Sequence, residues 1–246
     1  MIRLVRAELT KLATTRLIYG LAAAMAAFAV LTLAANILDR QGAPPLSADH
    51  YPMLIGGPVT LLSGAALVLG ILGMAGEFRH QTVTQTFLVT PDRGRVVAAK
   101  LVAYPLAGIA LTLGILVFTA AVATGWLAAK GITPSLLDAR LGRVLLGAVL
   151  AAGLCALVGV GVGALVRNQV AALVGVAVWV LLVEGLLMSL LNAPNLGKWL
   201  PSAAAAALTN PGGAQLSRLA GSLLLAAYAL ALAAAGTRLV VRRDIT

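Results

Sequence analysis

Unbroken apolar runs of about twenty residues recur along this chain and are separated by short polar segments. A helix needs about twenty apolar residues to cross the hydrocarbon core of a membrane, whereas a strand of a transmembrane barrel alternates over about ten. The runs therefore predict an all-α integral membrane protein, with residues 1–246 forming one transmembrane domain. The six predicted spans cover about 17–38, 54–75, 99–128, 144–166, 170–191 and 217–239.

The overall composition supports a membrane protein. Hydrophobic residues make up 61% of the chain and charged residues 11%, whereas soluble domains have roughly 45–50% apolar and 25% charged residues. The formal net charge of +10 would suit a nucleic-acid-binding protein, but no soluble basic domain carries it. We interpret the charge as a bias between the two sides of a membrane, and we expect no nucleic-acid partner.

The distribution of Lys and Arg predicts the orientation of the chain. If the N-terminus is cytoplasmic, twelve of the eighteen basic residues lie on the cytoplasmic side and six on the other. The excess of basic residues on the cytoplasmic side places both termini in the cytoplasm. The segment 76–98 then becomes the largest internal cytoplasmic loop, and the turn 167–169 becomes the other one.

Residues 1–16 are predicted to form an amphipathic helix on the inner membrane surface. Apolar residues spaced three and four apart line one face of such a helix, while basic residues lie elsewhere on it. A basic helix with one apolar face lies in the membrane interface. A short basic anchor with accidental periodicity is the alternative. The apolar residues are Ile2, Val5, Leu9 and Leu12, and the basic ones are Arg3, Arg6 and Lys11.

The segment 192–215, before the last span, is too apolar for a solvated loop and too interrupted by Pro and Gly to span a membrane. A re-entrant hairpin that enters the outer leaflet under the cover of neighbouring helices fits both observations. An exposed alanine-rich loop is equally compatible with the composition.

Glu184 is the only acidic residue well inside a predicted span. A charge at that depth costs about 2.5–3.5 kcal/mol, so the carboxylate must be paired, protonated or turned toward a polar cavity. Two roles remain open: a bond that fixes neighbouring helices, and a place in a transport path. Arg143, at the outer end of the fourth span, is a candidate partner.

Glycines are frequent in the second and fourth spans, for example Gly70 and Gly159. Small residues let helices approach closely in a membrane, so we expect them at helix contacts within the chain. Contact between two subunits is the alternative.

The chain lacks the motifs of the common hydrolases. It has no GxxxxGK[ST] phosphate loop and no HExxH motif, and its two histidines, His50 and His80, are predicted on opposite sides of the membrane. No span offers a nucleophile with a plausible base. We therefore expect no enzyme activity, no metal site and no cofactor bound by this chain.

The polar segment from Gly76 to Lys100 contains six of the charged residues of the chain. The segment shows Glu, an aromatic residue and Arg, then Thr, then a Leu-x-x-Pro-x-Arg turn and a Lys that opens the next span. These residues are Glu77, Phe78, Arg79, Thr82, Leu88, Pro91, Arg93 and Lys100. Together with the Trp179 to Glu184 spacing and the Arg242-Arg-Asp end, this pattern resembles that of the ABC type-2 transporter permeases.

The resemblance implies the permease subunit of an ATP-driven exporter in the bacterial plasma (inner) membrane. Its expected partners are a second permease copy, either identical or a related paralogue, and a separate ABC ATP-binding subunit that holds ATP and Mg. The segment 76–98 would be the coupling loop, and 192–215 the external re-entrant hairpin. The residues expected to couple to the ATPase are Glu77, Phe78, Arg79, Thr82, Pro91 and Arg93.

A second class of function uses the same loop. A non-transporting membrane adaptor or immunity-type protein could bind a cytoplasmic partner through 76–100 without any substrate path. Phe78, Phe87 and Leu88 among the charges favour docking over a merely solvated connector, because interfaces combine aromatic and charged residues.

Overall fold

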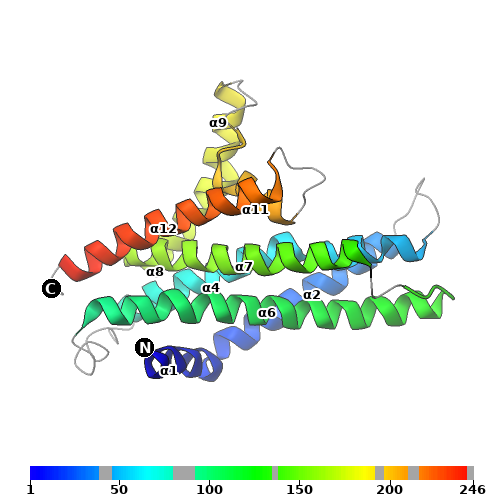
Figure 1. The fold of residues 1–246 in the computed structure, drawn as a ribbon, viewed down its shortest axis with the longest axis horizontal. Helices are drawn as coiled ribbons and strands as arrows, with labels where there is room; N and C mark the ends of the chain where they lie inside the picture. The colour runs from blue at the N-terminus through cyan, green and yellow to red at the C-terminus, as the bar shows by residue number, and fades with distance from the viewer. Residues whose placement is uncertain (39–45, 80–91, 135–137, 192–196, 210–215, 243–246) are drawn as a thin grey trace.

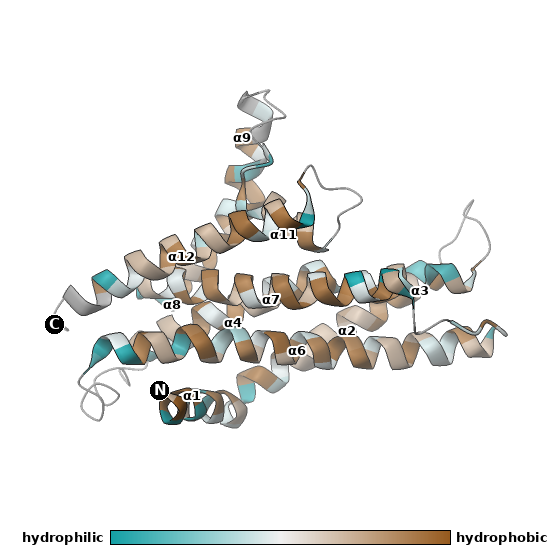
Figure 2. Ribbon diagram, viewed as in Figure 1, coloured by the Kyte–Doolittle hydropathy of each residue, from teal (hydrophilic) through white to brown (hydrophobic). Residues whose placement is uncertain are grey.

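The computed structural model describes residues 1–38, 46–79, 92–134, 138–191, 197–209 and 216–242, and these residues form helices and no strand. Six of the helical segments are long and apolar enough to cross a membrane. The protein is therefore a multi-pass, all-α membrane protein, which confirms this part of the predicted fold class. Hydrophilic residues gather toward the ends of the long helices, and apolar residues fill their middle (Figure 2).

The observed helices match the six predicted spans and extend several of them. In the first half of the chain, α1 (Ile2–Thr14) precedes α2 (Arg16–Leu38), and the short η1 (Ala48–His50) and α3 (Tyr51–Gly56) lead into α4 (Val59–Arg79). In the second half, the elements are α6 (Arg93–Ala129), α7 (Ala139–Val166), α8 (Gln169–Val178), η2 (Trp179–Val183), α9 (Glu184–Leu191), α11 (Pro201–Thr209) and α12 (Arg218–Arg242).

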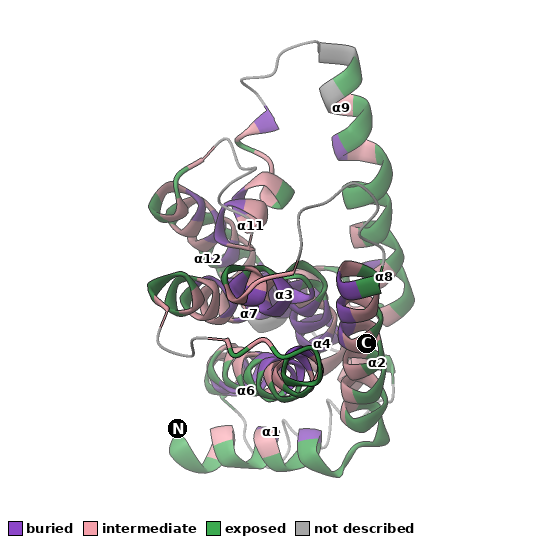
Figure 3. Cartoon of the chain, turned by 90° about the vertical axis from the view of Figure 1, so that its right-hand side faces the viewer, coloured by how far each residue is buried: buried purple, intermediate pink, exposed green. Residues whose placement is uncertain are grey.

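Helices α4 and α7 form the centre of the bundle. They pack against each other, and α6 and α12 pack against α7 (Figure 1). In their most apolar stretches, 56% of α4 and 61% of α7 is buried, against 11% in α2 and in Gln169–Leu187. Figure 3, viewed along the long helices, shows the buried residues concentrated on α4 and α7. The hydrophobic core therefore lies between these two helices.

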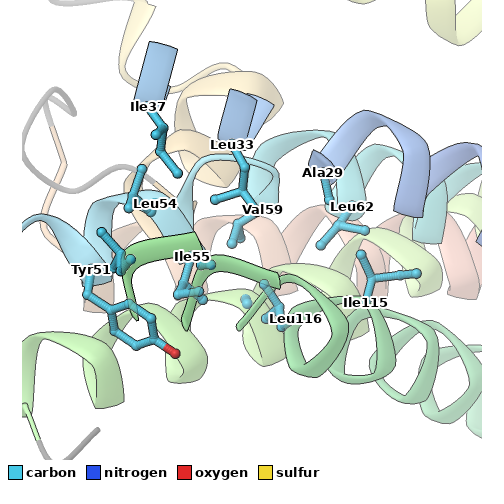
Figure 4. Close-up of a cluster of buried hydrophobic side chains, with 13 residues drawn as sticks. Ala29, Leu33, Ile37, Tyr51, Leu54, Ile55, Val59, Leu62, Ile115 and Leu116 are labelled. Carbon is cyan, nitrogen blue, oxygen red and sulfur yellow. The ribbon is translucent and has the colours of Figure 1, made fainter. Parts of the chain in front are cut away.

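One apolar cluster closes the end of the bundle that contains α3 (Figure 4). Leu33 of α2, Ile55 of α3 and Leu116 of α6 are among its buried members. Tyr51 is also buried there, and its hydroxyl lies 3.0 Å from the Thr124 hydroxyl of α6. The short α3 thus packs between α2 and α6.

The polar interval between α4 and α6 is shorter than the predicted coupling loop of 76–98. Helix α4 continues to Arg79, and α6 begins at Arg93, so only 80–92 lies between them. Asp92 begins α6 as an N-cap, because its side chain accepts a hydrogen bond of 3.1 Å from the backbone N–H of Arg95. Residues 80–91 lie outside the described residues, and α6 continues through Pro105.

Helix α1 runs across the long helices instead of along them, as Figures 1 and 3 show together. Only Thr15 separates it from α2. The Thr15 N–H and hydroxyl both donate to the Leu12 carbonyl, at 3.1 and 2.7 Å, and the Tyr19 hydroxyl donates to the Ala13 carbonyl at 2.8 Å. These bonds fix a sharp corner between the two helices. We call the end of the bundle that contains α1 and the C-terminal end of α12 the α1 end.

The segment α8–η2–α9 leads away from the layer of long helices (Figure 1). Helix α8 packs on α4 and α7, whereas η2 and α9 continue beyond them, with Leu181 and Leu182 of η2 and Leu186 of α9 exposed. Helix α11 lies within the predicted re-entrant segment 192–215 and packs on α12 and α7, with Ala204, Ala207 and Leu208 buried. Residues 201–209 therefore form a packed helix and no exposed loop; 192–196 and 210–215 lie outside the described residues.

Candidate functional site

Four charged side chains from three helices meet near the α1 end. Lys100 of α6 lies 2.6 Å from Glu8 of α1 and 2.9 Å from Glu77 of α4. Lys11 of α1 lies 2.8 Å from Glu8 and 3.0 Å from Glu77. Each cation thus contacts both anions, and the formal charges cancel. We call these four residues the charge network.

The charge network is buried on one side and open on the other. The side chain of Lys100 is 1% exposed and that of Glu8 5%, whereas that of Lys11 is 48% exposed. The Lys100 ammonium donates to Glu8 and, at 3.2 Å, to the Gly73 carbonyl, and it also contacts Glu77. An ammonium has three donors, so Lys100 is fully satisfied despite its burial.

Gly73 of α4 makes room for the aromatic neighbour of Lys100. A Cβ atom at this position would overlap the ring of Tyr104, which lies on α6 one helical turn after Lys100. The Lys100 ammonium lies 5.5 Å from the centre of that ring, within the range of a cation–π contact. The absence of a side chain at Gly73 thus lets α6 place Tyr104 and Lys100 against α4.

The network shifts the pKa values of the two α1 residues in opposite directions. Burial alone would raise the pKa of Glu8, but Lys100 and Lys11 outweigh it and lower this pKa below its ordinary 4.5. Burial alone would lower the pKa of Lys11, but Glu8 and Glu77 raise it above its ordinary 10.5. Stability from Glu8 is present above 4.5 and is lost as the pH falls through its lowered folded-state pKa. Stability from Lys11 is present below 10.5 and is lost as the pH rises through its raised one.

The structure separates the residues expected to couple to an ATPase. Glu77 lies in the charge network with its side chain 13% exposed. Arg79, the last residue of α4, is exposed, and Arg93, the first residue of α6, is half-buried. Thr82 and Pro91 lie outside the described residues.

Phe78, also in that set, connects α4 to the turn between α7 and α8. The Arg167 guanidinium lies 5.4 Å from the centre of the Phe78 ring and donates to the Leu239 carbonyl of α12 at 2.7 Å. Arg167 ends α7 in the left-handed conformation, with φ of 55°, which is uncommon for a residue other than glycine. Asn168 then caps α8 by accepting from the Ala171 N–H at 3.1 Å. This turn therefore ties α4, α7, α8 and α12 together at the α1 end.

Of the charge network, only Glu77 was among the predicted coupling residues; Lys100 was predicted only to open the third span, and Glu8 and Lys11 were not predicted as site residues. Glu8 lies on the same helix face as Val5, Leu9 and Leu12, which pack into the apolar cluster beside α4 and α6. An acidic residue on an otherwise apolar face was the available signal. Lys11 follows Glu8 at the i,i+3 spacing that brings two side chains together. Its pairing with Glu77 joins residues 66 positions apart and could not be inferred locally.

A second polar contact lies at Glu184, where η2 meets α9. The η2 segment is a π-helical turn, in which the Glu184 N–H donates to the Trp179 carbonyl. The Trp179 indole N–H donates to the Glu184 carboxylate at 2.8 Å. In a regular α-helix, residues five apart are about 140° apart around the axis, so the π-turn is what aligns these two side chains.

The other Glu184 oxygen accepts a hydrogen bond from the Ser202 hydroxyl of α11. The carboxylate is buried and thereby joins span five to the helix before the last span. Within the described part of the chain, no ion pair joins Glu184 to Arg143, the partner predicted from sequence. Its observed partners are Trp179 and Ser202, and these contacts support a role of Glu184 in fixing neighbouring helices.

We expect Glu184→Gln and Ser202→Ala each to loosen α11 from span five. A hydrogen bond to a charged group contributes about 1.5–3 kcal/mol, and Gln retains only one acceptor oxygen. The two substitutions remove the same contact, so the double variant should lose clearly less stability than the sum of the single losses. Equilibrium unfolding in mixed micelles measures this. Ser222→Ala is the control, because that hydroxyl bonds only within α12; additive losses would contradict the tie.

Both polar contacts hold helices together. Among the residues that the structure describes, no group of three His, Cys, Asp or Glu side chains could hold a metal ion. A scan against protein-family models and a search of curated proteins found no match to the chain.

Proposed function

We propose that this chain is the permease subunit of an ATP-driven exporter in the bacterial plasma membrane. The proposal combines the six membrane-crossing helices with the residue pattern of the segment 76–100. In this proposal the α1 end is cytoplasmic, and a separate ABC ATP-binding subunit docks there with its ATP and Mg. A second permease copy completes the transporter, and 192–215, with α11 inside it, serves as the external re-entrant hairpin.

The observation that carries the proposal is the position of the charge network. Glu77 lies near the end of α4, and Lys100 lies two turns after the start of α6, so the network joins the two helices on either side of the interval 80–92. A subunit that pushes on this interval would move both helix ends. The ion pairs to Glu8 and Lys11 would pass that movement to α1 and, through the fixed corner at Thr15, to α2.

This placement assigns different roles to neighbouring residues of the coupling segment. Arg79 is exposed and suits direct contact with the ATPase. Glu77 is largely covered and engaged with two lysines, so it suits transmission inside the permease. Docking and transmission can therefore be measured separately.

We expect Arg79→Ala to weaken binding of the co-purified ATP-binding subunit by about tenfold or more, as loss of an interface arginine does. Glu77→Gln should leave that affinity within about threefold but uncouple ATP hydrolysis from transport, because α4 then loses its ion pairs to Lys11 of α1 and Lys100 of α6. Titration of the purified subunit onto the reconstituted permease gives the affinity, and ATPase assays in proteoliposomes give the coupling. Arg140→Ala at the opposite end is the control, since Arg140 is also exposed.

Two results would overturn the proposal. If no phosphate-loop ATPase co-purifies with the intact chain, it is not a permease powered by such a subunit. If an ATPase binds but both variants retain normal affinity and coupling, the segment 76–98 is not the coupling loop. Binding of a cytoplasmic partner without ATP hydrolysis would instead favour the adaptor function.

A further inference from the structure

The four basic residues at the start of the chain fall into two groups in the structure. Lys11 is turned into the charge network and paired with two carboxylates. Arg3 and Arg6 of α1 and Arg16 at the start of α2 are exposed, and no ion pair involves them within the described residues. The positive charge of Arg3, Arg6 and Arg16 is therefore available to a partner.

The exposed arginines of α1 lie on the side away from the bundle. The packed face contains Val5, Glu8, Leu9 and Leu12, and Figure 3 shows the exposed residues of α1 along the opposite side. With 3.6 residues per turn, Arg3 and Arg6 lie about 60° apart on that outer face. Ile2 is also 86% exposed, but around the helix it lies next to Leu9, on the apolar side. The outer face is thus marked by the two exposed guanidinium groups.

The corner at Thr15 fixes where this face lies. Helix α2 is a candidate span that begins at Arg16, and only Thr15 separates it from α1. The hydrogen bonds to the Leu12 and Ala13 carbonyls keep α1 transverse to α2. A transverse helix attached directly to the start of a span lies at the depth of the lipid headgroups.

From this geometry we infer that the outer face of α1 binds the phosphate groups of anionic phospholipids through Arg3 and Arg6. Exposed guanidinium groups suit phosphate, which they can bind through two parallel N–H donors. Lys11 takes no part, because its charge is already neutralised by Glu8 and Glu77. The inference rests on the interfacial position of α1 and is independent of transport.

The test uses the full chain in nanodiscs of phosphatidylcholine alone or mixed with phosphatidylglycerol. A polarity-sensitive dye on a cysteine at Thr10, an exposed position of α1, reports contact with lipid, and buried Cys155 remains unlabelled. Titration with phosphatidylglycerol should change the dye signal. Each arginine removed should weaken the response about fivefold, and Arg3→Gln with Arg6→Gln together about thirtyfold. High salt should weaken it as well.

Matched variants distinguish this contact from other sources of charge. Arg140→Gln/Arg143→Gln removes two exposed arginines from the opposite end and should leave the response unchanged. Lys11→Gln should keep the preference for phosphatidylglycerol. The inference fails if the arginine pair variant responds like the wild type, or if Lys11→Gln loses the preference to the same extent. A dye signal that changes only when a soluble protein is added would assign the face to that protein. Coupled ATP hydrolysis is not measured, so failure here leaves the proposed function intact.

Discussion

Lys100→Met should lower the free energy of unfolding by about 3–5 kcal/mol, the range for removing one partner of a buried ion pair. The substitution leaves Glu8 and Glu77 to share Lys11, which is half-exposed. One carboxylate then remains buried without full compensation. Equilibrium unfolding in mixed micelles measures the loss, and hydrogen exchange should show α1 as the first segment to lose protection.

A charge-balanced double variant separates this effect from a general loss of packing. Glu8→Gln/Lys100→Met removes one charge of each sign and leaves the Lys11–Glu77 pair, 3.0 Å apart, in place. Because replacing both members of a buried pair is often nearly neutral, most of the lost stability should return. A double variant as unstable as Lys100→Met would show that Lys100 contributes through packing beside Tyr104 and not through its charge.

The second large effect is expected at the contact between α4 and α7. A Cβ atom on Gly70 would collide with the Ala156 carbonyl, and one on Gly159 would collide with the Leu67 carbonyl. Each helix thus places a glycine against the backbone of the other. Since backbone cannot rotate away as a side chain can, Gly70→Ala and Gly159→Ala must push the two central helices apart. We expect each to cost about 1–3 kcal/mol or more by overpacking.

Gly64→Ala is the matched control for this contact. Gly64 lies on the same helix as Gly70, but a Cβ atom there would meet nothing within 4 Å. Alanine also favours helix by about 1 kcal/mol over glycine, so this variant should be neutral or slightly stabilised. Thermal unfolding of the purified chain compares all three variants. Equal behaviour of Gly64→Ala and Gly70→Ala would contradict a close approach of the two backbones.

The spans could be predicted from sequence because each one depends on local composition. A run of about twenty apolar residues must form a helix in a membrane, where unpaired backbone groups are costly. The predicted ranges accordingly match the observed helices, including the short turn at Arg167 between α7 and α8. Boundaries next to polar segments were less accurate. The prediction assigned most of the residues from Glu77 to Arg79 and from Arg93 to Lys100 to a loop, but they belong to α4 and α6. Polar residues can continue a helix beyond the apolar run that crosses the membrane.

The partners of polar residues were harder to predict, because they depend on which helices become neighbours. Arg143 was a candidate partner of Glu184, because both were placed in the outer part of the membrane. In the structure, Glu184 is bound by Trp179 and by Ser202 of α11. The contact with Trp179 depends on a π-turn that no local sequence pattern predicted. Glu77 likewise belonged to the predicted coupling set, but its two lysine contacts came from α1 and α6.

The sequence by itself determined six helices long and apolar enough to cross a membrane, because apolar run length acts within each segment. Only the tertiary structure decided what the charges do. It brought Glu8, Lys11, Glu77 and Lys100 together from three helices and left Arg3 and Arg6 exposed. The physical reason is that a buried charge requires a partner within a few ångströms, and distance in space is set by packing and not by position along the chain.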